Sequence, residues 1–207
     1  MKSENVSKIR YDDKYNMLEE KHAKLRASNL YTSGLIGKYS SGSFEDLLCI
    51  HKYIFQDVYS FAGEIRTVNM SKGNLKFADV RYIESSIDSL EKMPCDDFDS
   101  ITNKYVEMNI VHPFREGNGR AMRIWINAVL ELKTGKIIDW SNISKEEYFS
   151  VIIKSPVDDE NIKELLYNSL TDNINDYHMF LNGIDQSFYY EGCDNYKFIG
   201  GTLCLRE

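Results

Sequence analysis

The chain has 207 residues, of which 43% are hydrophobic and 28% charged, and this balance is typical of one compact globular domain. Its net charge of -7, from 25 Lys and Arg against 32 Asp and Glu, argues against a nonspecific electrostatic grip on nucleic acid. A signal-peptide core is absent and no apolar run approaches the roughly 18 residues of a membrane span, so we expect a cytoplasmic protein without a membrane partner.

Helical periodicity dominates the sequence and predicts a mainly α fold. The first clear helix opens at Ser43-Phe44-Glu45-Asp46, which resembles a capping box, and its apolar residues recur at three- and four-residue spacing until about Gly63. Helical patterns resume over residues 79–93, 97–111, 118–133, 144–154 and 159–172. No repeat or long linker appears, so residues 1–207 are expected to form a single domain.

Two segments depart from the helical pattern. From residue 65 to residue 70 the side chains Ile65, Thr67 and Asn69 alternate with Arg66, Val68 and Met70, as in a strand. Lys72-Gly73-Asn74 is typical of a turn, so a short β-hairpin is expected over about 65–78. Further on, Gly183 interrupts the pattern before IDQSFYYEG, which predicts a short terminal helix over about 184–192. The residues after Gly192 give no clear prediction.

The stretch VHPFREGNGRAMRIW, residues 111–125, carries most of the chemistry. Pro113 disfavours a helix that continues past His112, so this histidine is expected at a helix end. With an ordinary pKa of about 6.5, an imidazole there is a natural general base for a hydroxyl nucleophile. Arg120 and Arg123 lie one helical turn apart in the next helix and can reach one ligand.

Between the two helices lies Gly117-Asn118-Gly119, just before a helix N-terminus with unpaired N–H groups. Glycines permit close backbone approach, so this segment is expected to cradle an anion such as phosphate. Glu116 beside it offers a hard oxygen ligand for Mg²⁺, which binds through one or two carboxylates plus substrate phosphates. The stretch therefore predicts a site for transfer of a phosphorus-containing group.

The segment HPFREGNGR, followed by Arg123, resembles the Fic-domain pattern HxFx[D/E]GNGRxxR at every fixed position. Residues 50–73, IHKYIFQDVYSFAGEIRTVNMSKG, are also similar to the region that precedes this motif in Fic proteins. The resemblance covers about 44–172. It implies a Fic fold, a helical bundle in which the hairpin at about 65–78 is the flap.

The resemblance implies transfer of AMP from ATP to a Ser, Thr or Tyr hydroxyl of a target protein, with release of pyrophosphate. His112 would deprotonate the hydroxyl, Glu116 would hold Mg²⁺, and the target segment would dock at the flap by strand-like pairing. The other residues implied in ATP binding are Lys72, Gly117, Asn118, Gly119, Arg120, Arg123 and Tyr148.

The segment SFYYEG, residues 187–192, resembles the [S/T]xxxE[G/N] inhibitory motif at the C-terminal position seen in class III bacterial Fic proteins. The resemblance implies that Glu191 pairs with Arg123, because a carboxylate competes with the γ-phosphate for the same guanidinium group. Ser187 lies four residues before Glu191, so the geometry of a helix allows a contact between them.

Several alternatives stay open. The same fold supports removal of AMP or transfer of another phosphorus-containing group, and a built-in inhibitory motif also suits a non-catalytic nucleotide-binding regulatory module. Tyr189 and Tyr190 are candidate self-modification sites if the terminal helix undocks. A homo-oligomer is a further open alternative, and the identity of the target protein is not readable from the sequence.

Overall fold

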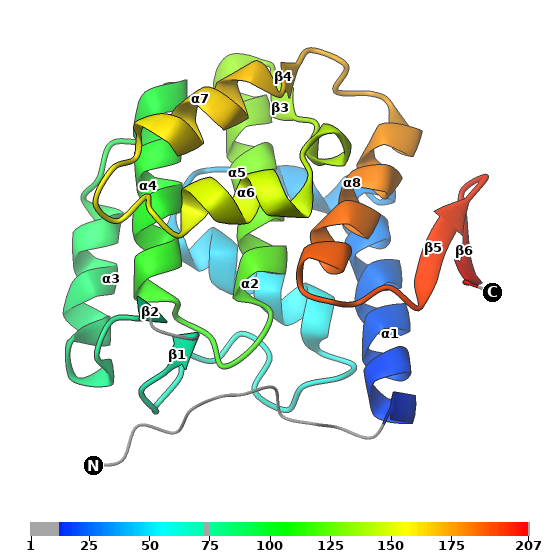
Figure 1. Ribbon diagram of the computed structural model, residues 1–207, viewed down its shortest axis with the longest axis horizontal. Coiled ribbons are helices and arrows are strands. Elements are labelled where there is room, and N and C mark those ends of the chain that lie inside the picture. The colour runs from blue at the N-terminus through cyan, green and yellow to red at the C-terminus, as the bar shows by residue number, and fades with distance from the viewer. Residues whose placement is uncertain (1–12, 73–74, 207) are drawn as a thin grey trace.

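The computed structural model describes residues 13–72 and 75–206, and helices dominate it (Figure 1). This confirms the predicted mainly α fold. The elements in chain order are α1 (Asp13–Thr32), η1 (Leu35–Lys38), α2 (Phe44–Phe55), β1 (Ser71–Lys72), β2 (Leu75–Lys76), η2 (Val80–Tyr82), α3 (Ile83–Glu91), α4 (Phe98–Val111), α5 (Asn118–Thr134), β3 (Ile137–Ile138), η3 (Trp140–Asn142), α6 (Lys145–Ile152), α7 (Glu160–Asn168), β4 (Leu170–Thr171), α8 (Tyr177–Tyr190), β5 (Tyr196–Ile199) and β6 (Thr202–Leu205). Within these described residues, no helix has the length and apolar character needed to cross a lipid bilayer.

Helix α5 lies at the centre of the bundle, with α2, α4 and α8 packed around it (Figure 1). Every residue from Asn118 to Leu130 is buried except the half-buried Gly119. The apolar stripe predicted for this helix, which includes Met122, Trp125 and Val129, packs into the core. Helix α5, which begins within the glycine motif, is therefore packed on all sides, and its first turn has a fixed position.

The predicted hairpin is present, although its strands are short. β1 and β2 pair antiparallel with Ser71 opposite Lys76 and Lys72 opposite Leu75. Residues 65–70 are not part of a strand. The backbone bonds of the stem include one from Phe77 N to Met70 O at 3.3 Å and one from Ala78 N to Ile110 O at 3.1 Å. The turn residues predicted at 73 and 74 lie outside the described residues.

The helix predicted to run to about Gly63 ends at Phe55, so that boundary was wrong. The chain turns back because the Gly63 N–H donates to Nδ1 of His51 at 2.9 Å, and Gly63 has the positive φ of 79° that the turn requires. Helix α7 is likewise shorter than the predicted 159–172, since Leu170 and Thr171 form β4 and pair with β3. Both differences arise from contacts distant in sequence.

The terminal helix is longer than the predicted 184–192, because α8 begins at Tyr177 and runs through Gly183. Helix α8 packs on η3 at this glycine, where a Cβ would lie 3.7 Å from Cβ of Trp140, an ordinary contact distance, and the helix continues unbroken. Glu191 is the C-cap residue, just beyond the last helical residue Tyr190.

Helix α1 and the hairpin β5–β6 are absent from the predicted elements. The hairpin projects from the body beside α1 and α8 (Figure 1), and buried charges join the three. Glu20 of α1 accepts hydrogen bonds from the backbone N–H groups of Asn195 and Tyr196, both at 2.9 Å. Lys24 of α1 donates to Asp185 of α8 at 2.9 Å. The C-terminal part of the chain is thereby anchored to its N-terminal helix.

Candidate functional site

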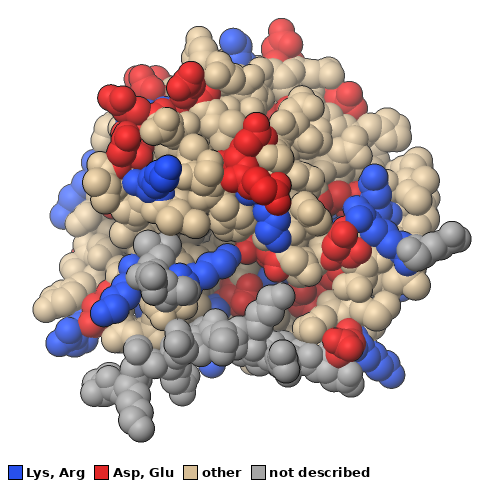
Figure 2. Space-filling model, in the orientation of Figure 1, with Lys and Arg blue, Asp and Glu red and all other residues tan. Residues whose placement is uncertain are grey.

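A cavity of about 720 Å³ opens between the flap, the end of α4, the loop before α5, helix α6 and the end of α8. This volume falls within the range of roughly 300–1,000 Å³ typical of small-molecule sites. Basic side chains gather around the flap on this face of the molecule (Figure 2). The cavity is lined by His112, Glu116, Gly117, Asn118, Gly119, Arg123, Tyr148 and Glu191, and by the basic residues Lys72, Lys76, Arg115 and Lys145.

His112 is the C-cap of α4 and adopts a left-handed conformation with φ 50° and ψ 63°. Its ring stacks on Phe77 of the flap stem, with 3.6 Å between the ring centroids. The pKa of His112 is lowered to about 3, mainly by burial and also by the charges of Lys72 and Arg66, against the opposing effect of Glu191. Nδ1 is buried with no hydrogen-bond partner in the part of the chain that the structure describes. The imidazole is therefore neutral near pH 7 and able to accept a proton.

The glycine loop has a fixed shape for three separate reasons. Gly117 has φ 80°, and a Cβ there would lie 2.4 Å from Cε2 of Phe55. At Gly119 a Cβ would lie 2.6 Å from Oε1 of Glu191, so a larger residue would displace that carboxylate. The side chain of Asn118 bonds both backbone groups of Phe114, at 2.9 Å and 2.8 Å. The first turn of α5 therefore borders the cavity with a rigid backbone, as an anion site requires.

His51 is hydrogen-bonded to the backbone of this loop. Its Nδ1 accepts from Gly63, so its Nε2 carries the proton and donates to the backbone oxygen of Glu116 at 2.9 Å. The ring stacks on Phe114 at 3.8 Å, and burial lowers the pKa of His51 to about 4. His51 therefore has a structural role, since it joins the loop before α5 to the turn at Gly63.

Two neutral buried histidines should make the protein sensitive to acid. Between pH 6.5 and pH 4 the unfolded chain would bind protons at His51 and His112 that the folded chain excludes, since the folded pKa values are about 4 and about 3. The unfolded state then binds more protons, so the free energy of unfolding should fall as the pH is lowered through this range. Urea unfolding at pH 7 and pH 5 measures the change.

The matched variants for that measurement are His51→Gln and His22→Gln. His51 is buried, whereas His22 is exposed on α1. The His51→Gln variant should lose less stability between the two pH values than the parent does, whereas His22→Gln should match the parent. Equal pH dependence in all three proteins would show that His51 is not held neutral in the folded state.

Glu116 lies at the cavity edge with 47% of its side chain exposed. Its Oε1 accepts from the N–H of Gly117 at 3.0 Å and lies 3.4 Å from Nη2 of Arg120. Across the described ranges, no three His, Cys, Asp or Glu side chains are arranged to hold a metal ion. A single exposed carboxylate beside an anion site does suit Mg²⁺, provided that phosphate oxygens complete its coordination.

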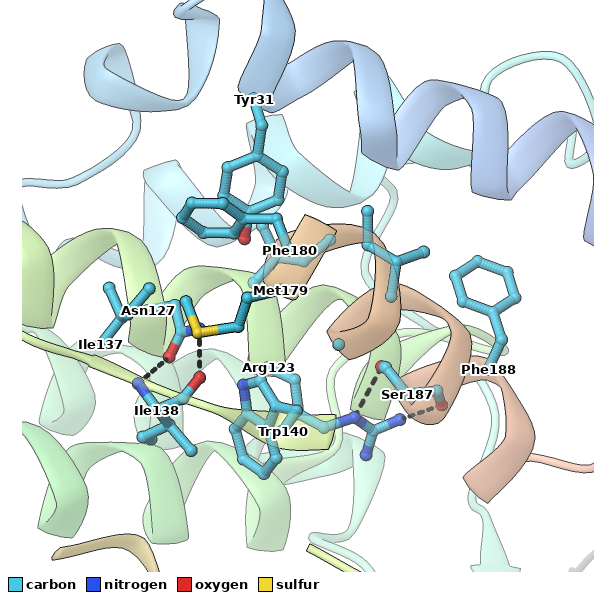
Figure 3. Close-up of a pocket in the computed structure, with 13 residues that line it drawn as sticks. Tyr31, Arg123, Asn127, Ile137, Ile138, Trp140, Met179, Phe180, Ser187 and Phe188 are labelled. Carbon is cyan, nitrogen blue, oxygen red and sulfur yellow. Dashed lines mark hydrogen bonds between the residues drawn. The ribbon is translucent and has the colours of Figure 1, made fainter. Parts of the chain in front are cut away.

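Arg123 reaches from α5 to the end of α8 (Figure 3). Its Nε donates to Oγ of Ser187 at 2.7 Å, and its Nη2 donates to the Ser187 carbonyl at 2.8 Å and to Oε1 of Glu191 at 2.9 Å. Ser187 thus contacts Arg123, in place of the Ser187–Glu191 contact that helical spacing allows. Lys72 approaches the other Glu191 oxygen at 3.4 Å.

The charges around Glu191 decide its protonation. Burial acts to raise the pKa of this carboxyl, but Arg123 and Lys72 outweigh it and lower the pKa to about 2. Glu191 is therefore ionised across the physiological range. A smaller cavity of about 20 Å³ lies on the other side of Arg123 (Figure 3), and its size allows no ligand larger than a water molecule.

Arg120 is not brought into the cavity, which contradicts the geometry expected for a phosphate ligand. The side chain is 2% exposed and donates from Nη1 to Oε1 of Glu19 on α1 at 2.5 Å. Its guanidinium carbon lies 4.7 Å and 5.0 Å from the ring centroids of Phe55 and Phe188. Arg120 faces α1 because that helix supplies a buried carboxylate. Glu19 was missed because no motif surrounds it.

Tyr148 borders the cavity but is 2% exposed and mainly bound to other aromatic residues. Its hydroxyl is 2.6 Å from that of Tyr105, and its ring stacks on Tyr190 at 5.0 Å. The hydroxyl of Tyr190 donates to the Ile143 carbonyl at 2.7 Å and is buried. Tyr189, in contrast, is 39% exposed. Of the two candidate self-modification sites, the structure leaves only Tyr189 accessible.

Residues 41–130 match the Fic/DOC family. The protein adenylyltransferase VbhT of Bartonella schoenbuchensis is 31% identical over 164 residues, which are 73% of this chain and 33% of that protein. A probable protein adenylyltransferase Fic of Salmonella typhimurium is 30% identical over 113 residues, 49% of this chain and 56% of that protein. The chain therefore spans a third to about half the length of these two relatives.

A solved structure has the same fold. The crystal structure of the BepC protein of Bartonella tribocorum with bound AMPPNP superimposes with a TM-score of 0.61 and 17% identity, over 77% of this chain and 88% of that chain. At this identity the likeness concerns the fold alone. The sequence motif, the geometry of the glycine loop and these similarities agree that residues 41–130 form a domain of the Fic/DOC type.

Proposed function

We propose that this protein transfers AMP from ATP to a side-chain hydroxyl of a target protein. The observation that carries the proposal is one nucleotide-sized cavity that holds a neutral His112, a rigid glycine loop and the carboxylate of Glu116. Two relatives named as adenylyltransferases, and a structural neighbour with bound AMPPNP, support it. The target would dock along the flap, whose stem contacts the His112 ring.

The chemistry follows from the positions of these groups. His112 would accept the proton of the target hydroxyl as its oxygen attacks the α-phosphorus of ATP. A new phosphorus–oxygen bond forms, the bond to the bridging oxygen of the β-phosphate breaks, and pyrophosphate leaves. N–H groups at the first turn of α5 would stabilise charge that develops on the α-phosphate. Glu116 would hold Mg²⁺, which neutralises phosphate charge when bound.

The same proposal includes inhibition by Glu191, in the manner of class III bacterial Fic proteins. The Glu191 carboxylate occupies Nη2 of Arg123, a donor that a γ-phosphate would otherwise use, and it lies against Gly119. Competition of this kind lowers productive ATP binding without closing the cavity. A charge-assisted hydrogen bond contributes roughly 1.5–3 kcal/mol, so its loss should increase activity by about 10- to 100-fold.

Labelled ATP tests the proposal. The Glu191→Gly variant, incubated with a bacterial lysate and ATP labelled at the α-phosphate, should label protein at least about tenfold more than the unsubstituted chain does. ATP labelled at the γ-phosphate should give no protein label, because pyrophosphate leaves. Addition of EDTA should abolish labelling if Mg²⁺ takes part.

The outcomes separate the alternatives. Label from γ-phosphate alone would show transfer of a phosphoryl group in place of AMP. Nucleotide binding without any labelling by Glu191→Gly would favour a regulatory module that binds nucleotide without turnover. Loss of pre-installed AMP from labelled protein would indicate removal of AMP. Equal labelling by the parent and the variant would reject inhibition by Glu191.

A further inference from the structure

Arg66 belongs to the first stem of the flap, and its side chain, which is 1% exposed, lies against the end of α4. All of its recorded side-chain hydrogen bonds go to main-chain carbonyl oxygens. Nη1 donates to Val68 at 2.7 Å and Nη2 to Ala78 at 2.5 Å, and these two carbonyls belong to the two stems of the flap. Nε donates to His112 at 2.7 Å and Nη2 also donates to Val111 at 3.1 Å, at the end of α4.

One planar guanidinium therefore joins three segments of the chain. The two flap stems, residues 65–70 and 77–78, and the end of α4 are also connected by the bond from Ala78 N to Ile110 O at 3.1 Å and by the stack of Phe77 on His112. The backbone N–H of Arg66 adds a bond to the Pro113 carbonyl at 2.8 Å, on the other side of His112. Figure 1 shows the flap beside the lower end of α4, where these contacts lie.

The physical chemistry favours arginine at this position. The last carbonyls of an α-helix lack partners within the helix, and a cation near them interacts favourably with the helix dipole. A guanidinium presents five N–H donors in a fixed plane, so one side chain can serve four carbonyls at once. Lysine carries the same charge on a single ammonium group with three donors, and it cannot span both flap stems and the helix end.

His112 is the residue that this arrangement constrains most. Its φ of 50° is unusual for a residue with a Cβ, so surrounding contacts must hold it in place. Arg66 binds its carbonyl directly, while Phe77, whose neighbour Ala78 is also bound by Arg66, stacks on its ring. Both the backbone and the ring of His112 are thereby tied to the flap stem.

We propose that Arg66 is a positioning residue that sets the distance between His112 and a target segment held along the flap. The inference rests on the proposed function, because His112 needs this placement only if it accepts a proton from a docked hydroxyl. A displacement of about 1 Å between reacting groups can cost about 100-fold in rate. Arg66 touches no reacting atom in this scheme and acts through His112 and the flap.

The first test compares Arg66→Lys with Arg26→Lys, both in the Glu191→Gly background. Arg26 is a matched control, since it forms a partly exposed ion pair with Asp57 at 2.7 Å and neither residue lines the cavity. Arg66→Lys should lower the rate of AMP labelling by about 10- to 100-fold at saturating ATP, while ATP affinity changes by less than about threefold. Arg26→Lys should leave both unchanged. Equal rates in the two variants would overturn the inference.

The second measurement needs neither activity nor a folded variant. In the unsubstituted protein, NMR should detect scalar coupling across the hydrogen bond from Arg66 Nε to the His112 carbonyl carbon. Hydrogen exchange of that Nε–H should match the exchange of the Phe77 and Ala78 amides, because the flap stems and Arg66 would separate together. Flap amides that exchange at least about tenfold faster than Arg66 Nε–H would show an uncoupled flap and reject the inference.

These readouts also separate the inference from the proposed function. If Glu191→Gly labels no protein, the proposed function fails, yet coupled exchange of Arg66 and the flap would still establish that Arg66 holds His112 and the flap as one unit. If Glu191→Gly labels protein but the Arg66 and flap signals are independent, the proposed function stands and the positioning role of Arg66 is wrong.

Discussion

Replacement of His112 by asparagine in the Glu191→Gly background should reduce AMP labelling by about 10²- to 10⁴-fold, the usual contribution of a general base. Asparagine is the sharpest choice because it tolerates the left-handed backbone found at this position, where φ is 50°. The amide cannot accept the hydroxyl proton. Labelling from α-labelled ATP, measured at saturating ATP, gives the rate.

Binding measurements complete this experiment. In the proposed mechanism His112 acts on the nucleophile, so ATP affinity in His112→Asn should stay within about threefold of the Glu191→Gly parent. Arg123→Ala in the same background should weaken ATP binding by about tenfold or more, since it removes a charged donor from the cavity. Isothermal titration with ATP determines both values. The reverse order of affinities would contradict the roles assigned to the two residues.

Replacement of Glu19 by alanine should destabilise the protein by about 3–5 kcal/mol, because it removes the buried carboxylate partner of Arg120 and leaves only the partly exposed Glu116 at 3.4 Å. Arg120 is 2% exposed and Glu19 only 8%, and the hydroxyl of Tyr59 also donates to Glu19 at 3.0 Å. For a chain of this size each kcal/mol shifts Tm by about 2–4 °C, so the melting temperature should fall by roughly 6–20 °C.

An exposed ion pair provides the control. Lys133 and Asp96 are 3.3 Å apart, with 83% of the Asp96 side chain exposed, and such pairs contribute about 0–1 kcal/mol. Asp96→Asn should therefore lower Tm by no more than a few degrees, about 4 °C at most. The paired change Glu19→Met with Arg120→Met should recover part of the stability lost in Glu19→Ala. If Glu19→Ala has the same Tm as Asp96→Asn, the burial of Arg120 does not depend on Glu19.

The part of the site formed by one continuous segment could be predicted from the sequence, whereas contacts between residues far apart in the chain could not. The segment from His112 to Arg123 is continuous, so helix ends, glycine conformations and charge spacing indicate its shape directly. Arg120 meets a carboxylate 101 residues away, and Arg66 binds a carbonyl 46 residues away. Helical periodicity predicts which residues face a neighbour but not which neighbour they face.

The extent of α8 illustrates the same limit. Glycine lowers helix propensity, so Gly183 suggested a helix boundary, but α8 runs through this position and packs on η3. Tertiary packing outweighs a local preference of about 1 kcal/mol. The hairpin β5–β6 was missed for a related reason, because its attachment depends on Glu20 and Lys24 of α1, which contact it from a distant part of the chain.

The anchoring of α8 also determines how Glu191, under the proposed inhibition, would respond to ATP concentration. Asp185 is bound by buried Lys24, whereas Glu191 lies beyond the last helical residue, with Gly192 next to it at a φ of 82°. Release of Glu191 from Arg123 therefore requires rotation about a few bonds and leaves the helix docked. Such an exchange is a one-to-one competition, so activity should rise hyperbolically with ATP, without a threshold or a Hill coefficient above one.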